Sequence, residues 1–343
     1  MEQFGLKDRI LIGITLFSMF FGAGNLIFPP FLGAQAGTRT WAAMAGFAVS
    51  AVGLPVLGVV AVTLSGGLKN LASRVHPKFA AIYIVVLYLA IGPCLAIPRT
   101  ASTSFSMAVI PFLGDRMPLE GFQAVYSFVF FAAAAGVAMH PEKLTEYLGK
   151  KLTPILLGLI LVIFGSAGLS PAGSAAPPRA AYASMAPAHG FLYGYQTMDT
   201  LAALNFGMII AMNIREKGIK KEKEVMKETV CAGWAAGIFL LVIYAMLAFV
   251  GMTSSGAFPV TADGTEVLSL VTGRVFGSGG TVILAFIFVI ACFNTCVGLL
   301  SCCGKYFSTL FPAASYKIWV LIFAFVSMVI SNVGLNAILK VSE

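Results

Sequence analysis

The chain has 343 residues, of which 59% are hydrophobic and only 10% are charged, whereas a soluble domain carries about 25% charged residues. Such a sequence could not cover a soluble fold with polar groups, and a disordered chain needs low hydrophobicity, so both classes are excluded. The net charge is +8, but Lys and Arg form short clusters between apolar runs, which argues against a nucleic acid partner. The six cysteines lie in or beside apolar runs, and neither a disulfide framework nor a metal site is expected from their spacing.

Nine apolar segments are long enough to cross a bilayer, since a spanning helix needs about 20 mostly apolar residues. They are residues 9–33, 41–66, 79–110, 121–139, 146–168, 187–213, 229–252, 280–307 and 316–338. The first apolar run is too long for the core of a cleavable signal. The sequence therefore predicts an all-α, multi-pass protein of the lipid bilayer in which residues 1–343 form a single transmembrane domain.

The distribution of basic residues predicts the orientation of these segments. If the N-terminus is cytoplasmic, the inside segments hold sixteen Lys and Arg residues and the outside segments hold five, while Arg99 lies within a span. Because cytoplasmic loops carry an excess of Lys and Arg, we expect a cytoplasmic N-terminus. The alternation of charge also supports the number of spans.

Three connections have a composition of their own. Residues 170–188 are rich in Ala, Pro, Gly and Ser, which predicts an irregular outside linker. Residues 214–228 alternate basic and acidic side chains and are expected to form a solvated helix extension on the inside. Residues 258–276 predict a short outside helix, with Thr265 and Glu266 near its start as helix caps prefer.

The first apolar segment carries residues that weaken a helix near its middle. Gly22, Gly24 and Asn25 lie at mid-depth, and Pro29 and Pro30 follow within a turn or so. Glycine destabilises a helix interior, and proline removes a hydrogen-bond donor, so we expect unwinding over residues 22–25. Irregular backbone at this depth is tolerated only where it is buried in protein or lines a polar cavity. The break is therefore a candidate binding site, although glycines can also serve helix packing.

The sixth segment has a second break of the same kind. Residues 190–200 include Gly190 and Gly194 together with Tyr, Gln and Thr side chains and Asp199. A carboxylate in the middle of a membrane costs about 2.5–3.5 kcal/mol on insertion scales and marks a functional candidate. Asp199 could instead cap the second half of this helix or pair with a backbone amide.

The two breaks lie five helices apart, so the broken helices run in opposite directions. Interrupted segments at corresponding positions of two inverted halves mark the site of an inverted-repeat transporter. Half-helix N-termini attract a carboxylate, and freed carbonyl groups attract an ammonium group or a sodium ion.

Two further spans carry polar side chains. Asn294 and Thr295 lie near the middle of the eighth segment, where their oxygens could bind sodium, or could make interhelical or same-helix hydrogen bonds. Arg99 in the third segment is expected to extend toward the outside or to pair with a carbonyl group, and a role in substrate binding is a further alternative. No catalytic pair, HExxH sequence or phosphate-binding loop occurs, so we expect no enzyme activity and no ATP hydrolysis.

Three separated motifs resemble a known family. Residues 17–30, continuing through Gly33 and Gly37, resemble the signature of the bacterial branched-chain amino acid:cation symporter family. Residues 92–101 and residues 194–199 are similar to the same family, and the resemblance covers nearly the whole chain.

The resemblance implies a leucine-transporter-like fold of five plus five helices in inverted repeats, with helices one and six broken. The repeats would be residues 9–168 and 187–338. Substrate-binding residues would be Gly22, Ala23, Gly24, Asn25, Gly194, Tyr195, Thr197 and Asp199. A sodium ion would lie between helices one and eight, near Ser18, Phe21, Asn294 and Thr295, and no other cofactor is implied.

One departure from the family is apparent. The fold needs ten core helices, whereas this sequence offers nine, so the second repeat would lack its last helix. The sequence is thus expected to be C-terminally truncated, or to contain a span that the apolar pattern does not reveal.

The sequence as a whole predicts a sodium-coupled symporter in a bacterial inner membrane that imports leucine, isoleucine and valine by alternating access. Two alternatives stay open at this point. The protein could be a proton-coupled carrier of another amino acid or amine, with Asp199 as the proton relay. It could also be a truncated remnant or sensor that binds without transporting.

Overall fold

All regular elements in the described part of the chain are helices. The computed structural model describes residues 5–332 except 114–118, 180, 220, 259–260 and 262. The α-helices are α1 (Leu6–Phe20), α2 (Ala23–Ala36), α3 (Thr40–Ala48), α4 (Leu54–Leu64), α5 (Leu68–Ser73), α6 (Pro77–Leu89), α7 (Ala96–Ala108), α8 (Leu119–Ala138), α9 (Thr153–Leu169), α10 (Tyr182–Tyr195), α11 (Asp199–Glu216), α12 (Glu222–Ser254), α13 (Gly264–Phe276), α14 (Ser278–Leu310) and α15 (Tyr316–Ser331). Short 3-10 or π-helical segments continue or join them, namely η1 (Gly37–Arg39), η2 (Val49–Gly53), η3 (Ala90–Cys94), η4 (Ile110–Phe112), η5 (Pro141–Lys143) and η6 (Thr145–Leu152).

Fewer spans follow from helix length and hydropathy than the nine predicted from the apolar runs. Six described helical stretches are long and apolar enough to cross a membrane, and the bent pair α10 and α11 makes a seventh. The difference has three causes. The break shortens α1 to 15 residues, α2 counts together with α3 and α4 as one stretch, and α15 has 16 residues. The end of the predicted segment 316–338, beyond residue 332, lies outside the described residues.

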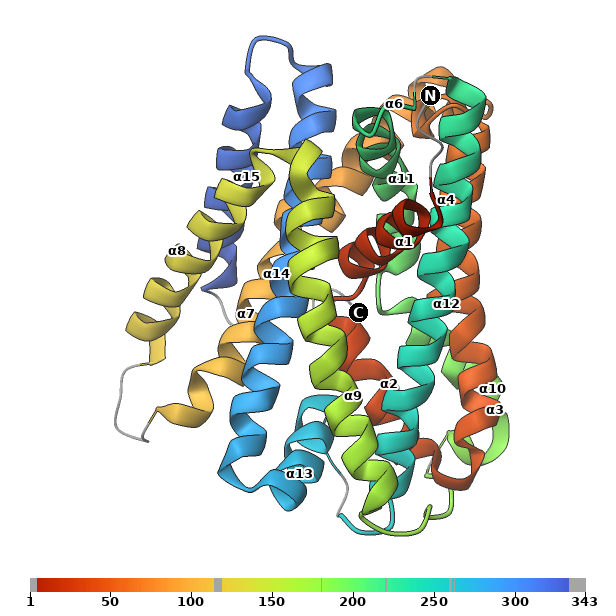
Figure 1. Cartoon of the computed structure of the whole chain (residues 1–343), viewed down its shortest axis with the longest axis vertical. Coiled ribbons are helices and arrows are strands. Elements are labelled where there is room, and N and C mark those ends of the chain that lie inside the picture. The colour runs from red at the N-terminus through yellow and green to blue at the C-terminus, as the bar shows by residue number, and fades with distance from the viewer. Residues whose placement is uncertain are drawn as a thin grey trace.

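The helices form an upright bundle with α1 and α2 near its middle (Figure 1). The chain reverses after α2 at Gly37, which has a φ of +49°, and α3 to α4 then run back along the outside. Helices α8 and α15 pack together on one side, whereas α12 packs against both α1 and α2 on the other. This arrangement surrounds the junction of α1 and α2 with protein, as irregular backbone at membrane depth requires.

The predicted connections agree with the structure in most respects. Residues 170–179 form an irregular stretch, whereas residues 182–188 of the predicted linker are helical and begin α10. The charged segment 214–228 includes the end of α11 and the start of α12, in which Val225 and Glu228 are buried. The short helix expected within residues 258–276 is α13. Its cap is Asp263, whose carboxylate accepts hydrogen bonds from the N–H groups of Thr265 (2.8 Å) and Glu266 (3.0 Å).

Glycines bring α2 and α12 into backbone contact. A Cβ atom added at Gly251 would lie 2.7 Å from the carbonyl carbon of Pro30, and one at Gly33 would lie 2.8 Å from the backbone nitrogen of Met252. Small residues at such crossings allow the close packing that drives helix association in membranes. Helix α12 thereby becomes a fixed support for the second half of the broken helix.

We predict that Gly251→Ala destabilises the protein, because the new methyl group would meet backbone atoms that cannot turn aside. Overpacking of this kind costs about 1–3 kcal/mol. The matched control is Gly136→Ala in α8, where an added Cβ meets nothing within 4 Å, and alanine there is expected to be neutral or stabilising by about 0.5–1 kcal/mol. Melting temperatures in detergent would measure both, and an equal effect of the two substitutions would contradict this packing.

Candidate functional site

The first broken helix separates at two residues, Phe21 and Gly22. Helix α1 ends at Phe20, and α2 begins at Ala23. The N–H group of Gly22 donates to Asn25 Oδ1 at 3.0 Å, so the asparagine side chain closes the gap. Carbonyl groups at the end of α1 and N–H groups in the first turn of α2 lack intrahelical partners, and these helix ends carry partial negative and positive charge.

The second broken helix separates between α10 and α11. Tyr195 ends α10 and Asp199 begins α11, and the two helices are bent by 46°. Met198 adopts a φ of +66°. Among the described residues other than glycine, it alone has a left-handed backbone conformation. Such a conformation is costly for a methionine and persists only where the surrounding structure fixes it.

A buried polar network joins the two breaks to α12. Asn25 Nδ2 donates to Asp199 Oδ2 at 2.6 Å and also to the hydroxyl oxygen of Tyr244. The Tyr244 hydroxyl donates to the same Asp199 oxygen at 2.9 Å. All three side chains are nearly excluded from solvent. Since unpaired polar groups are expensive at this depth, these bonds hold the two broken helices in a fixed relation.

A narrow cavity lies between the two breaks. Its lining includes Gly22, Ala23 and Asn25 from the first break, and Thr197, Met198 and Asp199 from the second. The space open to the centre of a water-sized molecule is about 30 Å³, which is enough for ordered water and little more. The structure therefore describes a closed form of this cavity, in which half-helices or side chains must move before a larger molecule can enter.

Arg99 of α7 reaches into the same cavity. The residue is 6% exposed, and its Nη2 atom donates to the carbonyl oxygen of Thr197 at 3.4 Å. A positive and a negative side chain, Arg99 and Asp199, thus line one small space.

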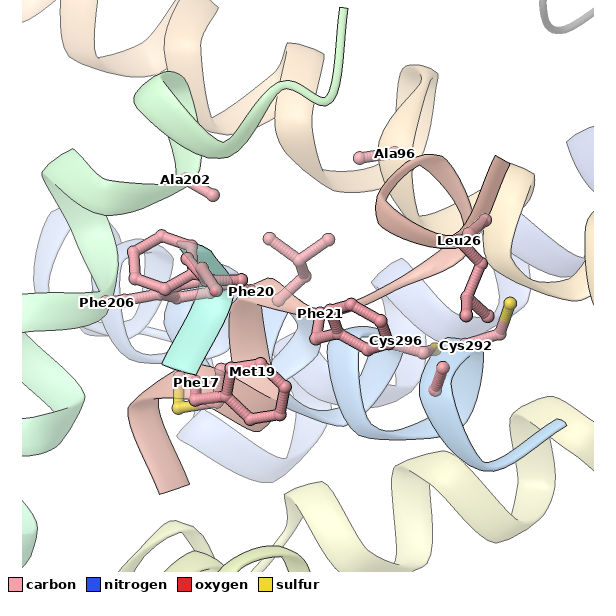
Figure 2. Close-up of a cluster of buried hydrophobic side chains, with 14 of the residues drawn as sticks. Phe17, Met19, Phe20, Phe21, Leu26, Ala96, Ala202, Phe206, Cys292 and Cys296 are labelled. Atoms are coloured by element: carbon pink, nitrogen blue, oxygen red, sulfur yellow. The ribbon is translucent and has the colours of Figure 1, made fainter. Parts of the chain in front are cut away.

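Apolar side chains complete the walls (Figure 2). Phe20 of α1 meets Phe206 of α11 edge to face, with ring centroids 5.1 Å apart. Ala96 and Ala202 approach the break from α7 and α11, and Met19, Ile91 and Leu299 also line the cavity. The cavity therefore combines a charged, hydrogen-bonding part with an apolar part.

Unpaired polar atoms lie where α14 passes the first break. An added Cβ at Gly22 would lie 2.7 Å from Thr295 Oγ1, so α14 touches the gap itself. Thr295 Oγ1 and both polar atoms of the Asn294 amide are buried without a hydrogen-bond partner among the described residues. The carbonyl groups of residues 18–21 likewise accept no hydrogen bond in the described structure. Several oxygen atoms with free lone pairs are thus available on α1 and α14.

Two ion pairs hold the start of α1 against its neighbouring helices. Arg9 donates to both oxygens of Glu228, at 2.7 and 2.6 Å, and Lys217 donates to Asp8. The hydrogen bond from Lys217 lowers the pKa of Asp8 below its usual value, so this carboxylate stays ionised at neutral pH. The pairs tie the start of α1 to α11 and α12.

The chain matches known transport proteins over almost its whole length. Residues 6–343 match the family described as branched-chain amino acid transport protein. The branched-chain amino acid permease BraB of Bacillus subtilis is 41% identical over 338 residues, covering 98% of this chain and 76% of that protein. The permease BrnQ of Escherichia coli K12 is 38% identical over 343 residues, covering 99% of this chain and 77% of that protein.

The chain belongs to the branched-chain amino acid transport protein family. It is a multi-pass membrane protein related to bacterial permeases and not an enzyme.

Two solved structures show the fold of this family member. Mhp1, described as a nucleobase-cation-symport-1 family transporter, superposes with a TM-score of 0.58 at 13% identity, covering 96% of this chain and 74% of Mhp1. MhsT, described in complex with L-phenylalanine, gives 0.51 at 15% identity, covering 94% of this chain and 78% of MhsT. The predicted leucine-transporter-like class with broken helices one and six is therefore confirmed.

The structure gathers most of the residues predicted for the substrate, with two exceptions. Gly22, Ala23, Asn25, Thr197 and Asp199 line the cavity. Gly24 lies beside it, since an added Cβ would be 3.2 Å from Arg99 Nη2. In contrast, Gly194 packs against Phe47 of α3, and Tyr195 is 47% exposed. Neither lines the cavity, because the two residues precede the break on faces of α10 that point elsewhere.

The residues predicted for sodium are divided between the cavity and its surroundings. Thr295 lines the cavity, and Asn294 lies beside it on α14. The Ser18 hydroxyl donates to its own helix, to the Thr15 carbonyl oxygen at 2.8 Å, which leaves the lone pairs of its oxygen available. Phe21 is fully buried, and its ring stacks on Phe17.

Of two further site residues, Arg99 was predicted in a substrate role only as one of three alternatives, and Tyr244 was not predicted at all. The expected outward extension of Arg99 is wrong, whereas its pairing with a carbonyl group is confirmed. A kink at Gly92, with φ −87° and ψ −120°, precedes α7 and could have signalled a third irregular span. Tyr244 sits in an ordinary apolar run, and nothing in the sequence distinguishes it.

We predict that Asn25→Ala strongly destabilises the closed structure. The change removes the acceptor for the Gly22 N–H group and two donors to Asp199 and Tyr244, and a lost bond to a charged group costs about 1.5–3 kcal/mol. Asn332→Ala is the control, because that side chain is exposed and bonds only to its own helix, at the Met328 carbonyl oxygen. Equal melting temperatures for the two variants would contradict the role given to Asn25.

Proposed function

We propose that this protein is a sodium-coupled symporter that imports branched-chain amino acids across a bacterial cytoplasmic membrane. The cavity between the two broken helices carries the proposal, because it joins opposite charges and free helix ends to an apolar wall. The named permeases and a carrier protein of Pseudomonas aeruginosa that is 39% identical support the substrate class. Leucine, isoleucine and valine share a small branched apolar side chain that suits this wall.

The substrate's polar groups would bind at the two breaks. The first turn of α2, from Gly22 to Asn25, offers N–H groups and partial positive charge to a carboxylate. Thr197 and Asp199 offer oxygens to the ammonium group. Asn25 acts mainly by positioning, since its amide already bonds to Gly22, Asp199 and Tyr244. Gly194 and Tyr195 would contribute by shaping α10 and not by contact.

The sodium ion would bind between α1 and α14. A sodium ion is coordinated by oxygen ligands. Here these would be the free carbonyl oxygens at the end of α1, Thr295 Oγ1 and the Asn294 amide oxygen. The buried, unpaired state of the Asn294 and Thr295 atoms supports this assignment, because buried polar atoms are nearly always partnered.

Transport would proceed by alternating access around this fixed cavity. The ion pairs at the N-terminal end would act as an inner gate, with the N-terminus in the cytoplasm as the charge distribution of the loops indicates. Within the proposed repeats, residues 9–168 and 187–338, a helix bundle would rock against a scaffold around a site near the midplane. Ion and substrate drive such a change only by binding one state more tightly than the other.

The decisive test is uptake of labelled leucine into proteoliposomes that contain this 343-residue chain. We expect accumulation with an inward sodium gradient and none when choline replaces sodium at fixed pH. Thr295→Ala should raise the sodium concentration needed for half-maximal uptake several-fold, whereas Thr309→Ala, an exposed residue bonded to its own helix, should not. Uptake driven by a pH gradient and abolished by Asp199→Asn would replace sodium with the proton. Binding without uptake under either gradient would favour the sensor alternative.

The inner gate gives a separate prediction. Glu228→Gln should free the start of α1, since Glu228 is 6% exposed and holds Arg9 with both oxygens. Because Arg9 is 44% exposed, solvent screens the pair, and we expect only a several-fold rise in amide hydrogen exchange of α1. Glu222→Gln is the control, since it breaks an exposed pair with Arg215. Unchanged exchange in α1 would remove this gate from the mechanism.

A further inference from the structure

We propose that Arg99 is the side chain that binds the substrate's α-carboxylate, opposite Asp199 at the α-ammonium group, so that the site recognises an amino acid as a zwitterion. This inference rests on the proposed function only in taking the cavity as the substrate site. It does not depend on which ion is coupled.

The position of Arg99 places its guanidinium group at both breaks. Helix α7 begins at Ala96, directly after the kinked η3, and carries Arg99 into the interior of the bundle. Nη2 lies 3.4 Å from the Thr197 carbonyl oxygen and 3.2 Å from the place of an added Cβ at Gly24. The guanidinium therefore lies beside the first turn of α2, where the free N–H groups also attract an anion.

The partners of Arg99 are too few for a buried cation. A guanidinium has five N–H donors, and the described structure gives it one hydrogen bond, whose length is beyond the usual 2.7–3.2 Å range for N–H to oxygen. No carboxylate of the described residues forms an ion pair with it within 4.0 Å. Leaving a buried charge unpaired is costly, so a ligand that supplies an anion would be strongly favoured here.

Asp199 lines the same cavity without pairing with Arg99. Asn25 and Tyr244 both bind its Oδ2 atom, and neither occupies Oδ1. Two opposite charges thus share one small cavity while being kept apart. An α-amino acid carries its carboxylate and ammonium groups on one carbon atom, and it can bridge two such charges directly.

Arginine is suited to the role by its geometry. The planar fork of its donors matches the two oxygens of a carboxylate. Its single long bond to Thr197 is weak enough to be given up when a carboxylate arrives. The side chain lines the cavity together with the residues of both breaks.

Competition binding to the purified full chain in detergent tests the pair of charges. Labelled leucine is displaced by leucine, by leucinamide, which lacks the carboxylate charge, and by 4-methylpentanoate, which lacks the ammonium group. For the unmodified chain we expect leucine to bind about 100-fold or more tightly than leucinamide, as a buried charge pair would give. Ligand-induced shifts of the melting temperature provide a second readout for variants that bind labelled leucine weakly.

Arg99→Gln should weaken leucine about 100-fold and leave leucinamide nearly unchanged, so that the preference collapses. Arg99→Lys should restore part of it. Arg179→Gln is the matched control, because Arg179 also donates to a backbone oxygen, that of Ser255, but lies away from the cavity. Asp199→Asn should show the mirror effect, with leucine weakened and 4-methylpentanoate unaffected.

The outcomes separate the inference from the proposed function. Equal weakening of leucine and leucinamide in Arg99→Gln would assign Arg99 a structural role only, and an unchanged preference would place the carboxylate elsewhere. Both results overturn the inference while leaving sodium-dependent leucine uptake intact. Absence of leucine binding by the unmodified chain would overturn the proposed function and this inference together.

Discussion

The carboxylate of Asp199 is the interaction on which the rest of the site depends. One of its oxygens accepts hydrogen bonds from Asn25 on the first broken helix and from Tyr244 on α12, while its own backbone begins α11. Helices α2, α11 and α12 therefore meet at a single carboxylate oxygen. The bilayer stabilises this arrangement. The polar backbone groups left unpaired at the two breaks have no water to bond with, so they must form hydrogen bonds within the protein.

The close packing around the breaks follows from the same constraint. Gly251 and Gly33 let α12 approach α2 at backbone distance, and Gly194 does the same for α10 against α3. The half-helix α2 is thus fixed by α12 along its length and by Asn25 at its start. The parts without such support are the free carbonyl groups of α1 and the guanidinium of Arg99, and these are the groups proposed to meet ion and substrate.

The sequence was most informative where one physical rule dominates. Apolar length predicted the helical segments. Glycine, asparagine and proline predicted the first break, and the glycines and polar side chains of residues 190–200 predicted the second, because such residues are rare in the middle of a membrane helix. The extent of the first break was predicted less well. Pro29 and Pro30 lie inside α2, where their missing donors leave carbonyl groups free without ending the helix, so the gap is limited to Phe21 and Gly22.

Side-chain direction could not be predicted from these patterns. Gly194 and Tyr195 stand next to the second break in the sequence, yet one packs against α3 and the other is exposed, because each residue turns about 100° along a helix. The alternatives for Arg99 could not be decided for the same reason, because its direction depends on the kink at Gly92, which only the three-dimensional structure reveals. Tyr244 has no sequence signal, since a tyrosine in an apolar run is ordinary.

Helix α1 connects the gate and the proposed ion site within one rigid element. Its start bears Asp8 and Arg9, which pair with Lys217 and Glu228, and its end bears carbonyl groups without hydrogen-bond partners in the described structure. A helix of 15 residues is about 22 Å long, so a small tilt at the paired end displaces the carbonyl groups at the other. An ion bound between α1 and α14 would oppose that tilt and thereby favour the closed gate. Release of the ion would remove the restraint, and the four charges at the N-terminal end would then decide whether the cavity opens inward. In this mechanism coupling needs no contact between ion and substrate, because both act on the position of α1.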